Sequence, residues 1–165
     1  MNIPVILIEL LVMFLAFGFL VFGLLLISPL TFISDYPPEI QAAYYRTQHK
    51  EAAKETRTVL MKIKKVVALI AYLFLFAWML HLAGAQTFVQ GLLLAYGYAL
   101  CLFAWDTFFI DWVLFANIKR IRLPGTEHMD KEYHQKWFHV KGCIPMIPVF
   151  AVLGALSSLL MMWLW

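Results

Sequence analysis

The stretch Pro4–Ile27 reads PVILIELLVMFLAFGFLVFGLLLI and carries a single charged residue, Glu9. About 20 consecutive apolar residues in an α-helix are needed to cross a hydrocarbon core of about 30 Å. The stretch therefore predicts a transmembrane helix. No Lys or Arg precedes Arg46, and the apolar run is longer than the core of a signal peptide, so we expect a retained span.

Three further apolar runs follow, at about 66–83, 88–118 and 143–165. The whole chain is 63% hydrophobic and only 14% charged, with a mean hydropathy of +0.79. Soluble domains are near half apolar and about a quarter charged, so this composition excludes an ordinary soluble globule. We predict an all-α integral membrane protein: one domain, residues 1–165, forming a four-helix bundle with its first span at about 4–27.

The thirteen Lys and Arg residues fall in two loops, at about 34–65 and 119–142. The positive-inside rule places both loops in the cytoplasm, and four spans then put both termini outside. We expect a multi-pass protein of a bacterial cytoplasmic membrane. Pro37 and Pro38 suit a first helical turn, and residues 40–65 lack Gly and Pro, so the first loop is predicted to be helical and to continue into the second span. Its basic residues would contact anionic lipid headgroups or dock a cytoplasmic partner.

Ionisable residues at membrane depth are the first candidates for function, because isolated ones are costly there. Four qualify: Glu9, His81, Asp106 and Asp111. The two aspartates lie at the inner end of the third run and are the candidate catalytic carboxylates. In an α-helix their spacing of five residues separates the side chains by about 140°, so each would need a partner from another element. The alternative is that they are interfacial anchors.

Glu9 is a candidate proton or cation ligand, or a carboxylate of the outer leaflet reached by water. His81, near the outer end of the second span, is interpreted as a packed or hydrogen-bonded residue. The third run, at 31 residues, would form a helix of about 46 Å, so it tilts, projects into the cytoplasm or breaks near the inner leaflet.

The second loop is the densest polar patch of the sequence. Pro124-Gly125 is a turn signal, and Thr126 is a plausible N-cap for a helix that begins at Glu127. Carboxylates and imidazoles at helical spacings can bind one divalent metal, such as iron, zinc or manganese, and Asp106 or Asp111 could complete the site. The candidate metal ligands are Glu127, His128, His134 and His139. The alternative is an amphipathic helix that carries Tyr133, Trp137 and Phe138 into the lipid boundary.

The remaining motifs are few. Cys101 and Cys143 form no CxxC pair and are interpreted as packed thiols. Glycines and alanines in the spans offer close helix packing and favour a compact bundle and an oligomer. The sequence contains no Gly-rich phosphate loop, no GxSxG motif and no His-rich array of the desaturase type.

Three functions remain open. The first is an oligomeric transport or channel-type component, or an accessory membrane subunit, in which Asp106 is the intramembrane carboxylate. The second is a membrane-embedded enzyme, with or without a divalent metal, that acts on a lipid or isoprenoid at the cytoplasmic face. The third is a structural subunit whose loops dock a partner. The expected partners are the bilayer and other copies of the chain or a larger membrane complex, and no nucleic acid.

Overall fold

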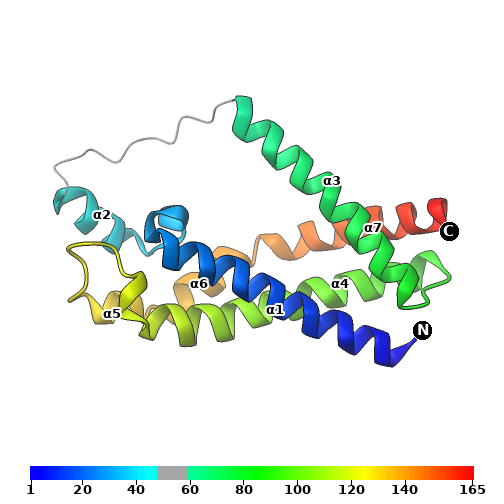
Figure 1. Ribbon diagram of the computed structural model, residues 1–165, viewed down its shortest axis with the longest axis horizontal. Coiled ribbons are helices and arrows are strands. Elements are labelled where there is room, and N and C mark those ends of the chain that lie inside the picture. The colour runs from blue at the N-terminus through cyan, green and yellow to red at the C-terminus, as the bar shows by residue number, and fades with distance from the viewer. Residues whose placement is uncertain (48–58) are drawn as a thin grey trace. The chain divides into compact units, whose positions relative to one another are not determined.

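The computed structural model describes residues 1–47 and 59–165, with side chains described for 1–47 and 66–165 (Figure 1). This part of the chain is helical and contains no strand, which confirms the all-α prediction. In chain order the elements are α1 (Ile3–Ile27), the 3₁₀-helix η1 (Pro29–Asp35), α2 (Pro38–Thr47), α3 (Val59–Leu82), α4 (Phe88–Trp105), the π-helix η2 (Asp106–Phe115), the 3₁₀-helix η3 (Lys119–Ile121), α5 (Asp130–Tyr133), α6 (Lys136–Cys143) and α7 (Met146–Leu164).

Within residues 1–47 and 59–165, three helices are long and apolar enough to cross a membrane: Ile3–Ile27, Phe88–Phe115 and Met146–Leu164. They correspond to the first, third and fourth predicted spans. Val66–Leu82, the apolar part of α3, is shorter than these three. Many large apolar side chains on these helices are exposed, among them Phe19 at 78%. Water is a poor solvent for such surfaces, so the helices suggest a membrane protein.

The chain divides into two compact units, which we describe separately. Unit 1 comprises the described residues of Met1–Met13, Thr56–Leu102 and Pro145–Trp165. In it α3 packs against α7, and α4 approaches α7 where Gly91 lies against Ser158 (Figure 1). The Ser158 hydroxyl donates a hydrogen bond to the carbonyl oxygen of Phe88 over 2.8 Å. Small residues on two helices thus allow close backbone packing.

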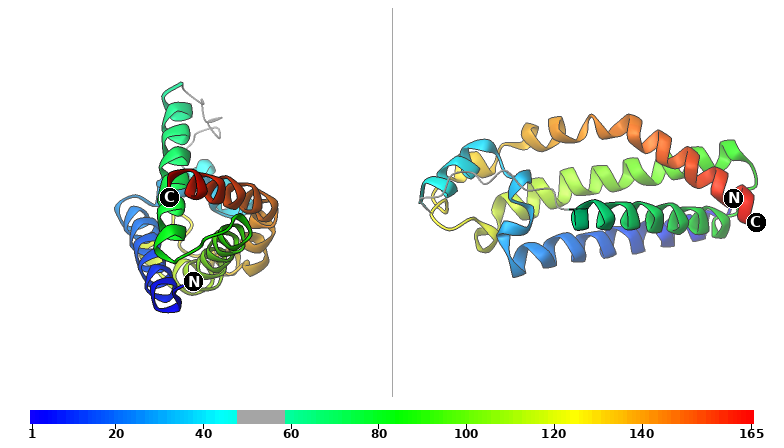
Figure 2. Two further views of the ribbon diagram at one scale, coloured as in Figure 1. Left: turned by 90° about the vertical axis from the view of Figure 1, so that its right-hand side faces the viewer. Right: turned by 90° about the horizontal axis from the view of Figure 1, so that it is seen from above.

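The two ends of the chain lie beside the α3–α4 turn within unit 1 (Figure 2). The backbone N–H of Asn2 donates to the carbonyl oxygen of Ala83 over 2.7 Å. The His81 ring stacks on the Trp165 ring, with 4.6 Å between ring centroids. Gly84 has a φ of 74° and closes the turn in a conformation that favours glycine.

Unit 2 comprises the described residues of Phe14–Glu55 and Phe103–Ile144. Its core is built around two buried tyrosines, Tyr36 and Tyr133. The Tyr36 hydroxyl donates to the carbonyl oxygen of Ile121 over 2.8 Å. The Tyr133 hydroxyl accepts a hydrogen bond from the backbone N–H of Leu123 over 2.9 Å. These bonds satisfy buried polar groups of a loop that has little regular structure. Burial also raises the pKa of both tyrosine hydroxyls.

The loop around Arg122 differs from the predicted helix, which was expected to begin at Glu127 with Thr126 as N-cap. Between η3 and α6, where every residue is described, the only α-helical turn is α5, Asp130–Tyr133. Thr126 is buried, and its hydroxyl hydrogen-bonds back to the carbonyl oxygen of Leu123 over 2.8 Å. The Arg122 guanidinium donates to the Glu127 carbonyl oxygen over 2.7 Å. These tertiary bonds hold the backbone in a loop, so the prediction of a helix from Glu127 is wrong.

Arg122 also forms an ion pair with Asp130 at 2.5 Å, and its side chain is only 1% exposed. The hydrogen bond and the charge of the guanidinium lower the pKa of Asp130. The pair therefore stays charged at neutral pH, and it supplies the counter-charge that a buried Arg requires. The Tyr133 ring lies 4.7 Å below the guanidinium carbon and adds a cation–π contact.

The first loop begins as predicted, because α2 starts at Pro38. α2 lies beside the Arg122 loop within unit 2, where Thr47 approaches Gly125 (Figure 2). The predicted continuation of this helix into the second span crosses residues 48–58, which lie outside the described residues. The basic residues Lys50, Lys54 and Arg57 lie there too.

Candidate functional site

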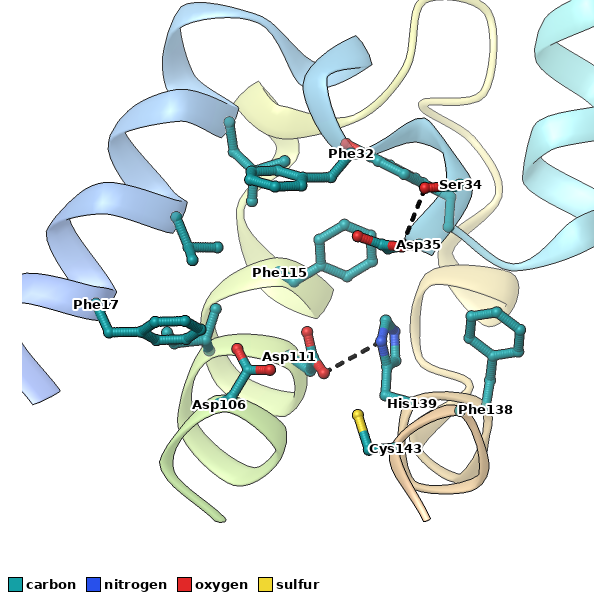
Figure 3. Close-up of a pocket in the computed structure, with 15 residues that line it drawn as sticks. Phe17, Phe32, Ser34, Asp35, Asp106, Asp111, Phe115, Phe138, His139 and Cys143 are labelled. Carbon is teal, nitrogen blue, oxygen red and sulfur yellow. Dashed lines mark hydrogen bonds and ion pairs between the residues drawn. The ribbon is translucent and has the colours of Figure 1, made fainter. Parts of the chain in front are cut away.

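A cavity of about 460 Å³ lies within unit 2, between four elements of the chain (Figure 3). Cavities that bind small molecules have volumes of about 300–1,000 Å³. α1 contributes apolar side chains, η1 contributes the carboxylate of Asp35, and η2 and α6 contribute the remaining ionisable groups. The ionisable and hydroxyl-bearing residues that line it are Ser34, Asp35, Tyr36, Asp106, Asp111, His139 and Cys143.

The π-helix η2 explains how Asp106 and Asp111 reach the same cavity. Backbone hydrogen bonds in a π-helix join residues five apart, so each turn holds more residues than the 3.6 of an α-helix. Residues at a spacing of five therefore lie much closer to one face. The expected separation of about 140° assumed α-helical geometry and is wrong for this segment. Both carboxylates line the cavity (Figure 3).

His139 on α6 forms the central polar contact of the site. Its Nδ1 lies 3.1 Å from Oδ2 of Asp111, and the two side chains are only 10% and 17% exposed. The Phe115 ring packs edge-on against the imidazole, with 5.4 Å between ring centroids. A carboxylate at Nδ1 favours the tautomer that carries its proton there and leaves Nε2 as a hydrogen-bond acceptor. Nε2 is buried and has no hydrogen-bond partner among the described residues.

The same arrangement can therefore accept and return a proton. A carboxylate that orients an imidazole, with the second ring nitrogen free, is the arrangement by which general bases are positioned in many enzymes. Of the histidines of the second loop, His139 alone lines the cavity with Asp106 and Asp111 among the described residues, and its imidazole contacts the carboxylate of Asp111.

Cys143 lies one helical turn after His139 and also lines the cavity. Burial, followed by the negative charges of Asp106, Asp111 and Asp35, raises the pKa of its thiol to about 11. A thiolate is the nucleophilic form of cysteine, so this environment disfavours a nucleophilic role at neutral pH.

The four predicted metal ligands do not come together. The Glu127 carboxylate is exposed and accepts a hydrogen bond from the Gly125 N–H over 2.9 Å. The backbone N–H of Glu127 itself, followed by that of Gly125, lowers the pKa of this carboxylate. His128 and His134 are exposed, and Nδ1 of His134 lies 2.6 Å from the carbonyl oxygen of Asp130. Within residues 1–47 and 66–165, no three His, Cys, Asp or Glu side chains are grouped so that they could hold a metal ion.

The other two intramembrane candidates lie in unit 1. The Tyr98 hydroxyl donates a hydrogen bond to Oε2 of Glu9, and Oε1 of Glu9 is buried without a partner among the described residues. His81 is exposed, and its ring is held against Trp165. Glu9 is thus tied to a neighbouring helix through Tyr98, whereas His81 is an exposed residue whose ring contacts Trp165.

Sequence reasoning missed Ser34, Asp35 and Tyr36 as parts of a site and interpreted Cys143 only as a packed thiol. The i, i+4 spacing of His139 and Cys143 could have placed both on one helical face. Nothing in the local sequence points to Asp35, because its cavity neighbours on η2 lie about 70 residues further along the chain.

The chain matches no protein-family model, and no curated protein or solved structure is significantly similar to it.

Proposed function

We propose that this protein is a multi-pass membrane protein that binds a membrane-soluble amphiphile in the unit 2 cavity and moves a proton on it through the Asp111–His139 pair. The observation that carries the proposal is the buried imidazole of His139, which is oriented at Nδ1 by Asp111, has no partner for Nε2 among the described residues, and lines a cavity large enough for a small molecule. The proposal corresponds to the membrane-embedded enzyme with a lipid-like substrate, and it requires no metal at Glu127, His128 or His134.

The apolar part of the cavity supports a lipid-like substrate. Phe17, Val21 and Leu25 of α1 line it, and α1 is one of the three helices able to span a membrane. Such a wall suits a hydrocarbon chain, while Asp111 and His139 suit a polar end. The reaction class we propose is proton abstraction or donation at this polar end, with His139 Nε2 as the atom that exchanges the proton.

Gly142 offers a direct test of the cavity. It lines the cavity, and a Cβ added there would meet no atom within 4 Å. Gly142→Leu is therefore expected to occupy cavity space without a backbone clash, and to displace the bound amphiphile. Protein extracted from its native membrane in a polymer-bounded lipid disc would be analysed by mass spectrometry. We expect one amphiphile to be enriched over bulk lipid in the wild type and lost in Gly142→Leu.

Gly97→Leu is the matched control, because Gly97 is also helical and a Cβ there also meets no atom within 4 Å, but it does not line the cavity. It should retain the amphiphile. The same lipid profile in all three proteins would contradict the proposal.

A transport component is the second candidate, and the position of Asp106 favours it. This carboxylate lines the cavity and belongs to the candidate membrane helix Phe88–Phe115. Carboxylates at membrane depth are typical of proton and cation pathways. Cation flux into proteoliposomes that is lost in Asp106→Asn, with no retained amphiphile in the wild type, would support this candidate over the first.

We also propose that the basic loops face the cytoplasm and both chain ends lie outside. The contacts of Asn2 with Ala83 and of Trp165 with His81 support one common side for the ends and the α3–α4 turn. In a variant with Cys101 and Cys143 replaced by Ser, a new Cys would be placed at exposed Gln86 or at exposed Lys131.

In intact cells, a membrane-impermeant maleimide should label Gln86→Cys and leave Lys131→Cys unlabelled until the membrane is permeabilised. Labelling of Lys131→Cys alone in intact cells would reverse the orientation.

A further inference from the structure

The charge of the cavity lining indicates which class of ligand the cavity binds. This inference rests on the proposed amphiphile site. The described residues of the lining include three carboxylates, from Asp35, Asp106 and Asp111, and neither Lys nor Arg. Among these residues the only basic group is the imidazole of His139, which is already paired with Asp111. An anionic head, such as a phosphate or diphosphate, would meet repulsion from these carboxylates and find no cationic partner in the described lining.

Aromatic rings make up much of the remaining wall. Phe17, Phe32, Tyr36, Phe115 and Phe138 line the same cavity as the carboxylates. The negative face of an aromatic ring attracts cations, and aromatic walls combined with carboxylates are the chemistry by which proteins recognise organic ammonium groups. The hydroxyl of Tyr36 is already bonded to Ile121, so this residue offers its ring rather than its oxygen.

The buried imidazole of His139 distinguishes the unit 2 cavity from a simple cluster of carboxylates. Its side chain is nine-tenths buried, it lines the cavity, and its Nε2 has no hydrogen-bond partner within the described part of the chain. Figure 3 shows the imidazole among the carboxylates of Asp35 and Asp111, with Asp106 on the neighbouring turn of η2. An unpartnered buried acceptor calls for a donor, and a protonated amine carries N–H donors together with the positive charge.

We propose that the unit 2 cavity binds an organic ammonium ion that bears an apolar substituent, with the charged nitrogen at Asp106 and Asp111 and the substituent against the aromatic wall. A ligand with at least one N–H would also donate to Nε2 of His139. Asp35 is exposed and also lines the cavity, so its carboxylate adds negative charge that attracts a cation.

The test uses the full-length protein in dodecyl maltoside micelles, at fixed salt, with three probes of similar shape. Benzyltrimethylammonium carries the positive charge, neopentylbenzene is its uncharged carbon isostere, and benzylsulfonate is an anionic counterpart. Isothermal titration should show the ammonium binding at least about tenfold more tightly than the neutral probe, and no binding of the anion. Benzylammonium, which has N–H donors, should bind at least as tightly as benzyltrimethylammonium. Any gain in affinity that comes from its N–H donors should be lost in His139→Phe.

Asp106→Asn and Asp111→Asn should each weaken binding of benzyltrimethylammonium by roughly tenfold, because each removes a carboxylate beside the cation. Glu39→Gln is the matched control: it makes the same charge change on an exposed side chain of unit 2 outside the cavity, and it should leave binding unchanged. Helical content measured by circular dichroism identifies any variant that fails to fold, and Gly142→Leu then provides an independent block of the cavity.

Equal binding of the ammonium and its neutral isostere would overturn this inference, as would unchanged binding in Asp106→Asn and Asp111→Asn. If the amphiphile retained from the native membrane is still lost in Gly142→Leu, the proposed site stands and only its preference for cations fails. If neither the amphiphile nor any probe depends on Gly142, the proposed function fails as well.

Discussion

Replacing Tyr133 by Ala is expected to lower the free energy of unfolding of unit 2 by about 3–5 kcal/mol. The Tyr133 side chain is only 1% exposed and packs against the rings of Tyr36 and Phe115. Its hydroxyl is hydrogen-bonded to the backbone N–H of Leu123 and to the hydroxyl of Thr126. Truncation would leave a cavity, leave the buried N–H of Leu123 without its partner and remove one hydrogen bond of Thr126, and these effects destabilise a fold.

Amide hydrogen exchange, followed by mass spectrometry of peptides from residues 119–144, would measure the effect where it arises. Tyr133→Phe keeps the ring and removes only the hydroxyl, so it should cost about 1–3 kcal/mol. Trp137→Ala is the control for loss of an aromatic ring, because Trp137 is 68% exposed and should change stability by no more than about 0.5 kcal/mol. Wild-type protection in Tyr133→Ala would show that this cluster does not hold the loop together.

Gly91→Ala is expected to destabilise unit 1 by about 1–3 kcal/mol. A Cβ at Gly91 would overlap with the hydroxyl oxygen of Ser158 and also press on its Cβ, which belongs to α7. The Ser158 hydroxyl is not free to move aside without loss, because it donates to the carbonyl oxygen of Phe88. The substitution therefore forces α4 and α7 apart or breaks that hydrogen bond.

Gly97→Ala supplies a closely matched comparison, since Gly97 lies in the same helix and a Cβ there meets no atom within 4 Å. It should be neutral or stabilising by up to about 0.8–1.0 kcal/mol, the preference for Ala over Gly inside a helix. Unfolding in mixed micelles of dodecyl maltoside and SDS, followed by circular dichroism, would compare the two variants. Equal stability of Gly91→Ala and Gly97→Ala would contradict the close contact between α4 and α7.

Much of the helical architecture could be predicted from hydropathy alone. The apolar runs at about 4–27, 88–118 and 143–165 correspond to the three helices of the described chain that are able to span a membrane, because a long apolar run with few charges has few alternatives to a helix. The start of α2 was predictable from Pro38, whose fixed φ suits a first helical turn. The membrane sides of the loops and termini stay predictions.

The loop at 122–133 was not predictable in the same way. Its local signals, Thr126 followed by Glu127 and polar residues at helical spacing, favour a helix, and tertiary bonds override them. The bonds that fix it come from side chains whose partners are set by the fold: Arg122 to Asp130, and Tyr36, 85 residues away, to Ile121. Local propensity is a weak prior when such a network is available.

The candidate site was predicted in part. Asp106 and Asp111 were selected because charge is costly at membrane depth, and both line the cavity. His139 was one of five histidines in the sequence, and no periodicity distinguished it from His128 or His134, which are exposed. Its role depends on α6 packing against η2, a contact that the sequence does not encode locally.

The π-helix η2 changes the direction in which each side chain points from Asp106 onward on the same helix. Because its turns hold extra residues, the helical wheel drawn from Phe88–Trp105 loses phase at Asp106 and cannot be extended to Trp112 or Phe115. Trp112 nevertheless donates to the carbonyl oxygen of Lys136, and Phe115 reaches Tyr36 and Tyr133. The change of helical phase at η2 thus lets Trp112 contact α6 and lets Phe115 contact the two tyrosines of unit 2.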